Sequence, residues 1–210
     1  MRMRRLKWAK DYIEQSKDVV FKPNTRKGKW NSYLNREEIH VEIGSGKGDY
    51  WIGMANLYPE YGWIGIEKNE SACALSLRKV EESKENAKFI YGDASIIDEW
   101  FDDGEIDVIH LNFSDPWPKR RTAKRRLSNA LFLKKYANIL KANGQIQMKS
   151  DNRKLFEYSI MEFQNNGFQL VEIDLDYRSE IHDEDVITEY EDKFMKIGPI
   201  YRAVWRKGEL

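Results

Sequence analysis

The sequence predicts an α/β domain with a doubly wound, mostly parallel sheet and an antiparallel edge at its C-terminal end. The chain has 210 residues, a length that fits one domain with a sizeable core. Short apolar runs typical of strands alternate with segments in which apolar residues recur at helical spacing. The last two strand-like runs follow each other without a helix, which indicates an antiparallel pair.

Five strand-like runs come before this last pair, and each is short and rich in β-branched or aromatic residues. Strand, helix, strand repeats imply a parallel sheet with helices on both faces. The expected strands are Ile39–Ile43, Trp63–Ile66, Lys88–Tyr91, Val108–Phe113 and Gln145–Lys149.

The helices expected between these strands have apolar residues at intervals of three and four. Ser128–Leu140 shows this pattern best, and Gly144 is expected to stop that helix. The other expected elements are helices at Asp49–Leu57, Ser71–Glu85 and Arg153–Gln164, and strands at Phe168–Tyr177 and Ile200–Arg206.

The charges cancel overall but are unevenly placed. Basic and acidic residues number 35 each, so the net charge does not indicate a polyanionic partner. Residues 1–30 carry ten basic and three acidic side chains, and residues 119–126 carry six basic and no acidic ones. Such stretches can bind phosphates even in a neutral protein. We therefore expect a basic N-terminal arm at residues 1–36 and a single domain at residues 37–210.

A cytoplasmic location is expected. The single cysteine, Cys73, excludes an internal disulfide and suits a reducing compartment. The basic start is followed by Lys7, Lys10 and Asp11, where a secretion signal would need an apolar core. No stretch is long and apolar enough for a membrane span. The three histidines are scattered, so no metal site is predicted.

The first expected strand leads into a glycine loop at residues 41–48, VEIGSGKG. Glycines let the backbone approach a ligand without a Cβ in the way. A dinucleotide fingerprint would need glycine in place of Asp49, and a P-loop would need glycine in place of Val41 and Ser or Thr in place of Gly48. Both patterns fail. The loop is therefore predicted to bind a cofactor without a pyrophosphate. The alternative is that it is a plain strand-to-helix turn with no ligand.

Carboxylates follow the next two expected strands. Glu67 lies about twenty residues beyond the glycines, the offset at which a ribose diol is usually bound. Asp93, which precedes Ala94, could accept a hydrogen bond from an adenine amine. Each acid alone is more often a solvated residue at a strand end. Because the carboxyl ends of parallel strands meet at one edge of a sheet, the loop and both acids together predict an adenosine site.

The fourth expected strand leads into residues 112–118, NFSDPWP. Prolines on either side of Trp117 fix φ and restrict the residues before them, so this loop should be stiff. A surface turn anchored by the tryptophan is the alternative. Directly behind it, the six cations at 119–126 are costly to crowd together unless phosphates relieve their repulsion, although a solvated charged face is also possible.

Taken together, these segments resemble the bacterial tRNA (guanine-N7)-methyltransferases of the TrmB type. The resemblance implies a seven-stranded, Rossmann-like methyltransferase fold, S-adenosylmethionine as methyl donor and guanosine 46 of the tRNA variable loop as acceptor. The matching segments keep the family's order and span nearly the whole chain: 28–31 (GKWN), 41–48 (VEIGSGKG), 112–119 (NFSDPWPK), 124–126 (KRR) and 188–194 (TEYEDKF).

The resemblance also implies roles for single residues. The cofactor site would comprise Glu42, Gly44, Gly46, Glu67, Asp93, Ala94 and Asp115, with Asp115 as the catalytic residue. The nucleoside would contact Lys119, Asp151, Thr188 and Glu191. The tRNA backbone would contact Arg121, Lys124, Arg125 and Arg126. Many relatives carry histidine where this chain has Thr122, so we expect no catalytic imidazole there.

The implied chemistry needs no general base. Guanine N7 has a lone pair and no proton, so the transfer requires alignment of donor and acceptor. Nearby carboxylates would favour the sulfonium and the cation that forms on the base. The base must be exposed to react, and Trp117 is a candidate to stack on it. The expected partner is tRNA, with no membrane and no obligate protein partner, and the protein would be a monomer or homodimer.

Three other classes of function stay open. A small-molecule or protein methyltransferase would share the first three strand ends but would not use the cationic loop. A non-catalytic RNA-binding module would leave the glycines and acids without a role. A nicotinamide dehydrogenase is disfavoured by Asp49 and by the lack of an obvious acid or base for hydride transfer.

Overall fold

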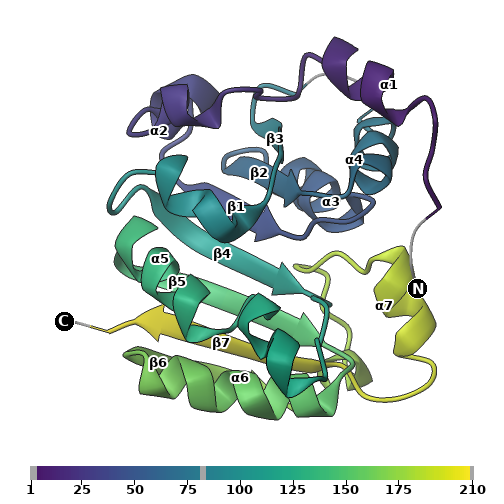
Figure 1. The fold of residues 1–210 in the computed structure, drawn as a ribbon. Coiled ribbons are helices and arrows are strands. Elements are labelled where there is room, and N and C mark those ends of the chain that lie inside the picture. The colour runs from purple at the N-terminus through teal and green to yellow at the C-terminus, as the bar shows by residue number, and fades with distance from the viewer. Residues whose placement is uncertain (1–3, 81–83, 209–210) are drawn as a thin grey trace.

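One mixed sheet runs through the computed structural model, which describes residues 4–80 and 84–208 (Figure 1). The strands are β1 (Ile39–Ile43), β2 (Gly62–Glu67), β3 (Ala87–Tyr91), β4 (Ile106–Asn112), β5 (Leu140–Ser150), β6 (Phe168–Asp174) and β7 (Tyr201–Lys207). They form a 7-stranded sheet in the order β3-β2-β1-β4-β5-β7-β6. The first five strands are parallel to their neighbours, whereas β7 is antiparallel to β5 and β6. The predicted fold class is confirmed.

Helices cover both faces of the sheet. Asparagine side chains cap several of them: Asn152, for example, accepts a hydrogen bond from the Leu155 N–H at 2.9 Å. The α-helices are α1 (Ala9–Gln15), α2 (Trp30–Leu34), α3 (Asp49–Leu57), α4 (Glu70–Leu77), α5 (Ala130–Ile139), α6 (Arg153–Asn165) and α7 (Glu189–Phe194). The 3₁₀ turns are η1 (Pro23–Arg26), η2 (Ala94–Glu99), η3 (Arg120–Arg125) and η4 (Tyr177–Ser179).

Successive side chains along a strand point to opposite faces of the sheet, and this divides the buried apolar residues into two clusters. Ile39, Val41 and Ile43 of β1 belong to the larger cluster, which also contains residues of α5 and α6. Trp63 of β2 belongs to the smaller cluster, with residues of α1, α3 and α4. The central strands β1 and β2 thereby lie between two helical layers.

Part of the basic N-terminal segment packs on the domain. Ala9 and Ile13 of α1 are buried in the smaller cluster, and α1 contacts α4. The Trp30 indole is fully buried and donates to the Trp100 carbonyl at 2.8 Å, while the Trp30 N–H donates to Glu105 at 2.8 Å. These residues of the segment therefore contribute to the core.

Three predicted boundaries are wrong. Helix α5 ends at Ile139 and β5 begins at the next residue, which pairs with Ile106, so Gly144 lies inside a strand and does not stop the helix. Helix α4 ends at Leu77, well before the predicted end at 85, and residues 81–83 lie outside the described residues. Strand β6 ends at Asp174, whose carboxylate accepts from the Asp176 N–H at 2.8 Å and turns the chain.

Two histidines that are far apart in sequence meet on one face of the sheet. His40 Nδ1 lies 2.9 Å from His110 Nε2, and Tyr50 Oη lies 3.3 Å from His110 Nδ1. Across residues 4–80 and 84–208, no group of three or more His, Cys, Asp or Glu side chains is arranged to hold a metal ion. Within the same ranges, every helix is too short or too polar to cross a bilayer.

Candidate active site

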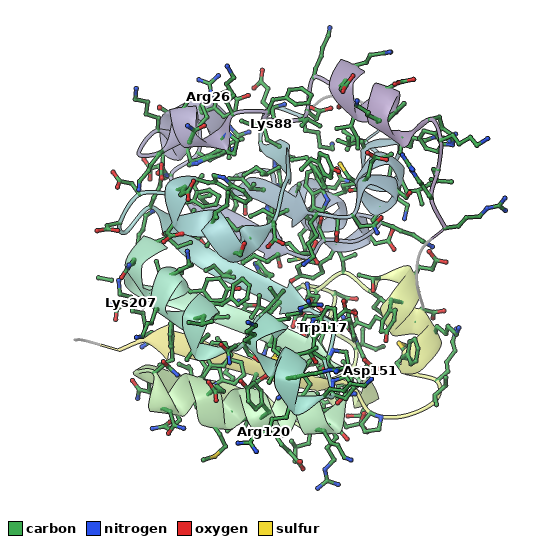
Figure 2. All side chains as sticks on the ribbon, viewed as in Figure 1. Arg26, Lys88, Trp117, Arg120, Asp151 and Lys207 are labelled. Carbon is green, nitrogen blue, oxygen red and sulfur yellow. The ribbon has the colours of Figure 1, made fainter. Side chains whose placement is uncertain are left out.

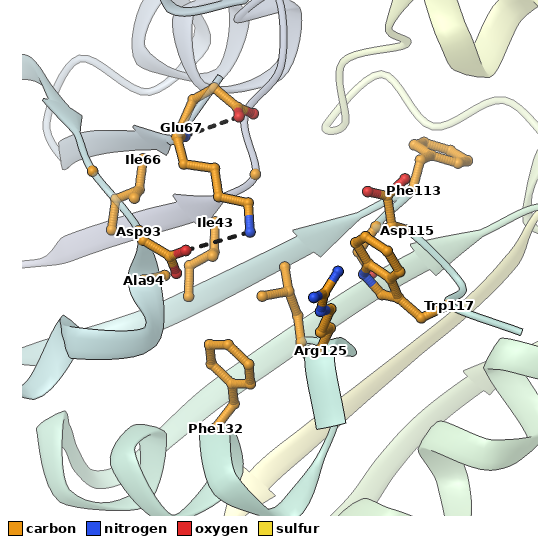
Figure 3. Close-up of a pocket in the computed structure, with 15 residues that line it drawn as sticks. Ile43, Ile66, Glu67, Asp93, Ala94, Phe113, Asp115, Trp117, Arg125 and Phe132 are labelled. Carbon is orange, nitrogen blue, oxygen red and sulfur yellow. Dashed lines mark hydrogen bonds and ion pairs between the residues drawn. The ribbon is translucent and has the colours of Figure 1, made fainter. Parts of the chain in front are cut away.

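Two cavities lie side by side at the carboxyl ends of β1 and β4. The first, of about 220 Å³, extends to the ends of β2 and β3 (Figure 3), and the second, of about 480 Å³, extends to α7. Gly44 and Phe113 line both cavities and so form the wall between them. The first cavity is also lined by Glu67, Asp93, Ala94, Asp115, Trp117 and Arg125. The second is also lined by Glu42, Ser45, Gly46, Asn112, Thr188 and Tyr190.

The glycine loop between β1 and α3 is left-handed at Gly44 (φ 76°) and Gly46 (φ 55°). A Cβ is strained at these φ values, so glycine is the residue that fits the turn. The Gly46 N–H donates to Glu67 Oε2 at 3.0 Å, which ties the loop to the end of β2. The backbone of the loop therefore faces the cavities without side chains in the way.

Glu67 at the end of β2 has a fixed carboxylate. Besides the bond from Gly46, its Oε1 accepts from the backbone N–H groups of Lys68 at 2.9 Å and Asn69 at 2.7 Å. A carboxylate offers about four acceptor sites, so capacity remains toward the cavity. Three backbone donors hold the group in one orientation, as binding of a sugar diol requires.

Asp93 after β3 lines the same side of the first cavity as Glu67 (Figure 3). Its Oδ1 accepts from the Ser95 N–H at 3.0 Å, and its Oδ2 lies 3.4 Å from Lys68 Nζ. Burial opposes the charged form, but the Ser95 N–H and the Lys68 ammonium outweigh it and lower the pKa of Asp93. The next residue, Ala94, is buried and provides an apolar surface beside this acid.

Glu42 of β1 is an acid held inside the protein. It is 3% exposed, and its oxygens accept from the Trp51 N–H at 3.1 Å and from Asn112 Nδ2 at 3.0 Å. Burial is the main cause that raises the pKa of Glu42 to about 8. Sequence reasoning assigned no role to Asn112, although it lies in one of the segments that carry the resemblance.

The chemistry of the two cavities fits the two halves of an adenosyl amino acid. The first has apolar walls, which include Ile43 and Phe132, and carboxylates at its edge, as a purine riboside requires. In the second, the Ser45 hydroxyl is buried without a hydrogen-bond partner among the described residues, and the buried acid Glu42, which has no ion-pair partner among them, lines the same cavity. A polar, cationic group is the complement of that pair.

The loop after β4 is held in an unusual backbone conformation. Phe113 (φ 50°) and Trp117 (φ 39°) are both left-handed, although neither is glycine. Arg126 donates to the carbonyls of Pro116 at 2.9 Å and Trp117 at 3.1 Å, and its guanidinium lies over the Tyr158 ring. The loop is therefore fixed by this arginine as well as by its prolines.

The basic residues behind this loop differ in their surroundings. Lys119, Arg121 and Lys124 are exposed on and beside η3. Arg125 lies with its guanidinium 5.0 Å from the Trp117 ring and lines the first cavity (Figure 3). Thr122 donates its hydroxyl to the Lys119 carbonyl at 2.8 Å.

Helix α7 forms the far wall of the second cavity and is anchored by buried charges. Glu191 is fully buried and accepts from Lys149 Nζ at 2.9 Å and Arg178 Nε at 2.7 Å. Asp185 pairs with the same two cations, at 2.6 Å from Lys149 and in close contact with Arg178. Thr188 caps the helix by accepting from the Glu191 N–H at 3.0 Å. Both oxygens of Glu191 are thus used inside the protein.

Asp151, directly after β5, approaches α7 (Figure 2). The Tyr190 hydroxyl is 3.4 Å from each Asp151 oxygen. The Tyr190 ring packs on Phe113 with a centroid distance of 5.1 Å. Sequence reasoning gave Tyr190 no role, although its segment carries part of the resemblance.

Comparison with known proteins decides the family. Residues 36–203 match a family described as "Putative methyltransferase". The tRNA (guanine-N(7)-)-methyltransferase of Oceanobacillus iheyensis is 45% identical over 207 residues, which cover 97% of each chain. That of Bacillus subtilis strain 168 is 42% identical over 212 residues, which cover 98% of this chain and 100% of the relative. This chain belongs to that methyltransferase family.

Solved structures agree with the fold of this methyltransferase. A structure described as an antibiotic related methyltransferase has a TM-score of 0.66 at 15% identity and covers 85% of this chain and 93% of its own. The 16S rRNA (adenine(1408)-N(1))-methyltransferase of Catenulisporales acidiphilia was solved with cosubstrate SAM. It has a TM-score of 0.60 at 12% identity, and the match covers 87% of this chain and 91% of that chain. The resemblance and the enzyme class predicted from the sequence are confirmed. The predicted donor, S-adenosylmethionine, agrees with this family.

Proposed function

We propose that this methyltransferase transfers the methyl group of S-adenosylmethionine to N7 of guanosine 46 in the tRNA variable loop. One observation carries the proposal: Phe113 separates a cavity suited to adenosine from one lined by α7, and carboxylates stand on both sides of it. The relatives that match nearly the whole chain support tRNA and N7 as the acceptor.

The first group of residues would bind the donor, which supplies an electrophilic methyl group when bound. Glu67 would accept from the ribose hydroxyls, and Asp93 with Ala94 would bind the adenine. The backbone at Gly44 and Gly46 would approach the amino acid part, and Glu42 would pair with its ammonium group. Each role follows from the cavity that the residue lines.

The second group would orient the acceptor. Guanine N7 brings its own lone pair, so no residue has to remove a proton before transfer. Asp115 would act as the catalytic residue by stabilising positive charge on the donor and on the methylated base. Lys119, Asp151 and Thr188 would surround the nucleoside. We assign Glu191 to hold α7 in place through Lys149 and Arg178, because both of its oxygens are already bonded.

The third group would hold the tRNA backbone. Arg121 and Lys124 are exposed and free to meet phosphates, and Arg125 stands at the edge of the first cavity. Arg126 would act mainly by supporting the Trp117 loop. We further propose that the basic arm, residues 1–36, adds phosphate contacts, and that the enzyme works in the cytoplasm as a monomer or homodimer.

The deciding experiment uses labelled S-adenosylmethionine and unmodified tRNA, followed by nucleoside analysis. The expected product is N7-methylguanosine at position 46, and it should be absent when the tRNA carries adenosine there. Transfer to another atom or another nucleotide, or no transfer, would contradict the proposal.

A further inference from the structure

One cation in the wall of the first cavity has no anionic partner among the described residues. The Arg125 guanidinium lines this cavity and lies 5.0 Å from the centre of the Trp117 ring (Figure 3). Across residues 4–80 and 84–208, no carboxylate lies within ion-pair distance of it. Arg125 is also exposed to solvent. Since contact with a ring holds an exposed cation only weakly, this side chain is free to turn toward a stronger partner.

The other charged residues that line this cavity are three acids and one lysine. Lys68 Nζ lies 3.4 Å from Asp93 Oδ2, so these two charges largely cancel. Glu67 accepts from backbone N–H groups, and Asp115 has no cation within ion-pair distance among the described residues. Two negative charges therefore suit the cavity to a cationic ligand, and Arg125 opposes them.

The methyl donor and the cofactor product of its reaction differ by one charge. S-adenosylmethionine carries a sulfonium, whereas S-adenosylhomocysteine carries a neutral thioether at the same place. An unpaired guanidinium repels the sulfonium form and leaves the affinity for the thioether form nearly unchanged. In its observed position, Arg125 therefore favours the product cofactor over the donor.

A phosphate is the partner that can remove this repulsion. Arg121 and Lys124 are exposed on the same 3₁₀ turn, η3, so a nucleic acid backbone that meets them comes close to Arg125. A guanidinium binds a phosphate through two parallel hydrogen bonds, which is a stronger interaction than its contact with one ring. Such pairing withdraws the guanidinium from the cavity or neutralises its charge, and either change leaves the cavity more negative.

We propose that Arg125 is a specificity-determining residue that couples the choice of cofactor to RNA binding. Unpaired, it lowers the affinity for S-adenosylmethionine relative to S-adenosylhomocysteine, and pairing with an RNA phosphate removes this effect. The inference rests on the proposed function, because it assumes that tRNA meets this loop. By linkage, the donor must raise the affinity for tRNA by the same factor by which tRNA raises the affinity for the donor.

The first test measures binding of the two cofactors to the enzyme without RNA, so it does not depend on turnover. Calorimetry gives the Kd of S-adenosylmethionine and of S-adenosylhomocysteine, and their ratio is the readout because a change in packing affects both ligands alike. In Arg125→Gln, the affinity for S-adenosylmethionine relative to S-adenosylhomocysteine should rise roughly twofold to fivefold, as expected for one charge at an exposed site. Arg125→Lys keeps the charge and should stay near the wild-type ratio.

The second test repeats the measurement with a tRNA that carries adenosine at position 46 and so lacks the target base. This tRNA should raise the wild-type ratio by about the same factor as Arg125→Gln does, and the gain should be much smaller in that variant. High salt should reduce the gain, because it screens the phosphates.

Arg120→Gln is the matched control. Arg120 is exposed on the same turn as Arg125 and loses the same charge, but it lines neither of the two cavities at the rim. Its cofactor ratio without tRNA should therefore equal that of the wild-type enzyme. Denaturant unfolding checks that each variant keeps the fold.

The outcomes separate the inference from the proposed function. If the wild-type enzyme forms no N7-methylguanosine from labelled donor and unmodified tRNA, the proposed function fails, whereas the cofactor ratio is measured independently of that product. If Arg125→Gln keeps the wild-type ratio, or changes both affinities by the same factor, the effect of the Arg125 charge is overturned. If tRNA leaves the wild-type ratio unchanged, or raises it equally in Arg125→Gln, the coupling through Arg125 is overturned.

Discussion

The amide of Asn112 donates a hydrogen bond of 3.0 Å to the carboxylate of Glu42, joining the ends of β4 and β1 beneath the glycine loop. The acid is 3% exposed, and no cation lies within ion-pair distance of it among the described residues. A neutral, protonated Glu42 is therefore favoured until a cationic ligand arrives. Binding of a cationic ligand is therefore coupled to release of the proton from Glu42.

Affinity for S-adenosylmethionine should rise with pH up to about 8. With a folded-state pKa raised to about 8, Glu42 carries a proton at neutral pH and must release it to pair with the ligand's ammonium group. The limiting slope is about tenfold per pH unit. Calorimetry at pH 7 in buffers of different ionisation enthalpy should detect proton release approaching one per ligand. In Glu42→Gln, binding should be weaker and this proton release should disappear.

Asp115→Ala should lose most activity and keep the fold. The carboxylate lines the donor cavity, and its removal takes away stabilisation of the charge that the transfer moves. We expect kcat to fall roughly 100- to 1,000-fold, as for removal of one preorganised electrostatic group. Single-turnover transfer to tRNA measures the effect, and unfolding curves check the fold. Asp183→Ala, in the exposed acidic loop, is the control and should stay at the wild-type rate. Wild-type turnover by the Asp115 variant would refute the assignment.

Binding of tRNA should weaken steeply with salt, and Arg121 and Lys124 should contribute to the slope. Each exposed cation that contacts a phosphate releases about one counterion from the tRNA. Each change to alanine should therefore reduce the slope of log affinity against log salt concentration by about one. Filter binding across a range of potassium chloride concentrations gives the slope. Lys134→Ala, exposed on α5, should leave it unchanged. A wild-type affinity that does not respond to salt would be incompatible with phosphate contacts.

Arg126→Ala should behave differently from its exposed neighbours. This side chain holds the Pro116 and Trp117 carbonyls, so its loss should release the strained loop and lower kcat while the salt slope stays nearly constant. Loss of two bonds from a charged donor should also cost about 2 kcal/mol of unfolding free energy. The same binding and turnover assays, together with denaturant unfolding, test this. A reduced salt slope with unchanged kcat would instead indicate a phosphate contact.

Much of the site could be predicted because a parallel sheet brings its strand ends together. Gly44, Glu67 and Asp93 each follow a short apolar run, so a local pattern was enough to place them at one rim. The predicted strands differ from the observed ones mainly at their ends. Local patterns carried less information in the last third of the chain, where structure depends on contacts between distant residues.

The anchoring of α7 is the clearest example. Lys149 pairs with Glu191, and Arg178 pairs with Glu191 and Asp185, across 42, 13 and 7 residues respectively. In the sequence these residues are ordinary loop acids and scattered cations. The nucleoside contact of Glu191 is implied only by the resemblance and stays a prediction. Likewise, the pairing of His40 with His110 depends on the register of β1 against β4, which hydrophobic spacing does not reveal.

Phe113 belongs to both cavities, and its ring packs on Tyr190 with a centroid distance of 5.1 Å. The donor and the base would therefore be separated by the side chain of Phe113 alone. A larger group on the donor would occupy space that the base needs, so the enzyme should accept few methyl-donor analogues with enlarged transferable groups. Replacing Phe113 by a smaller residue should increase the number of analogues that it accepts.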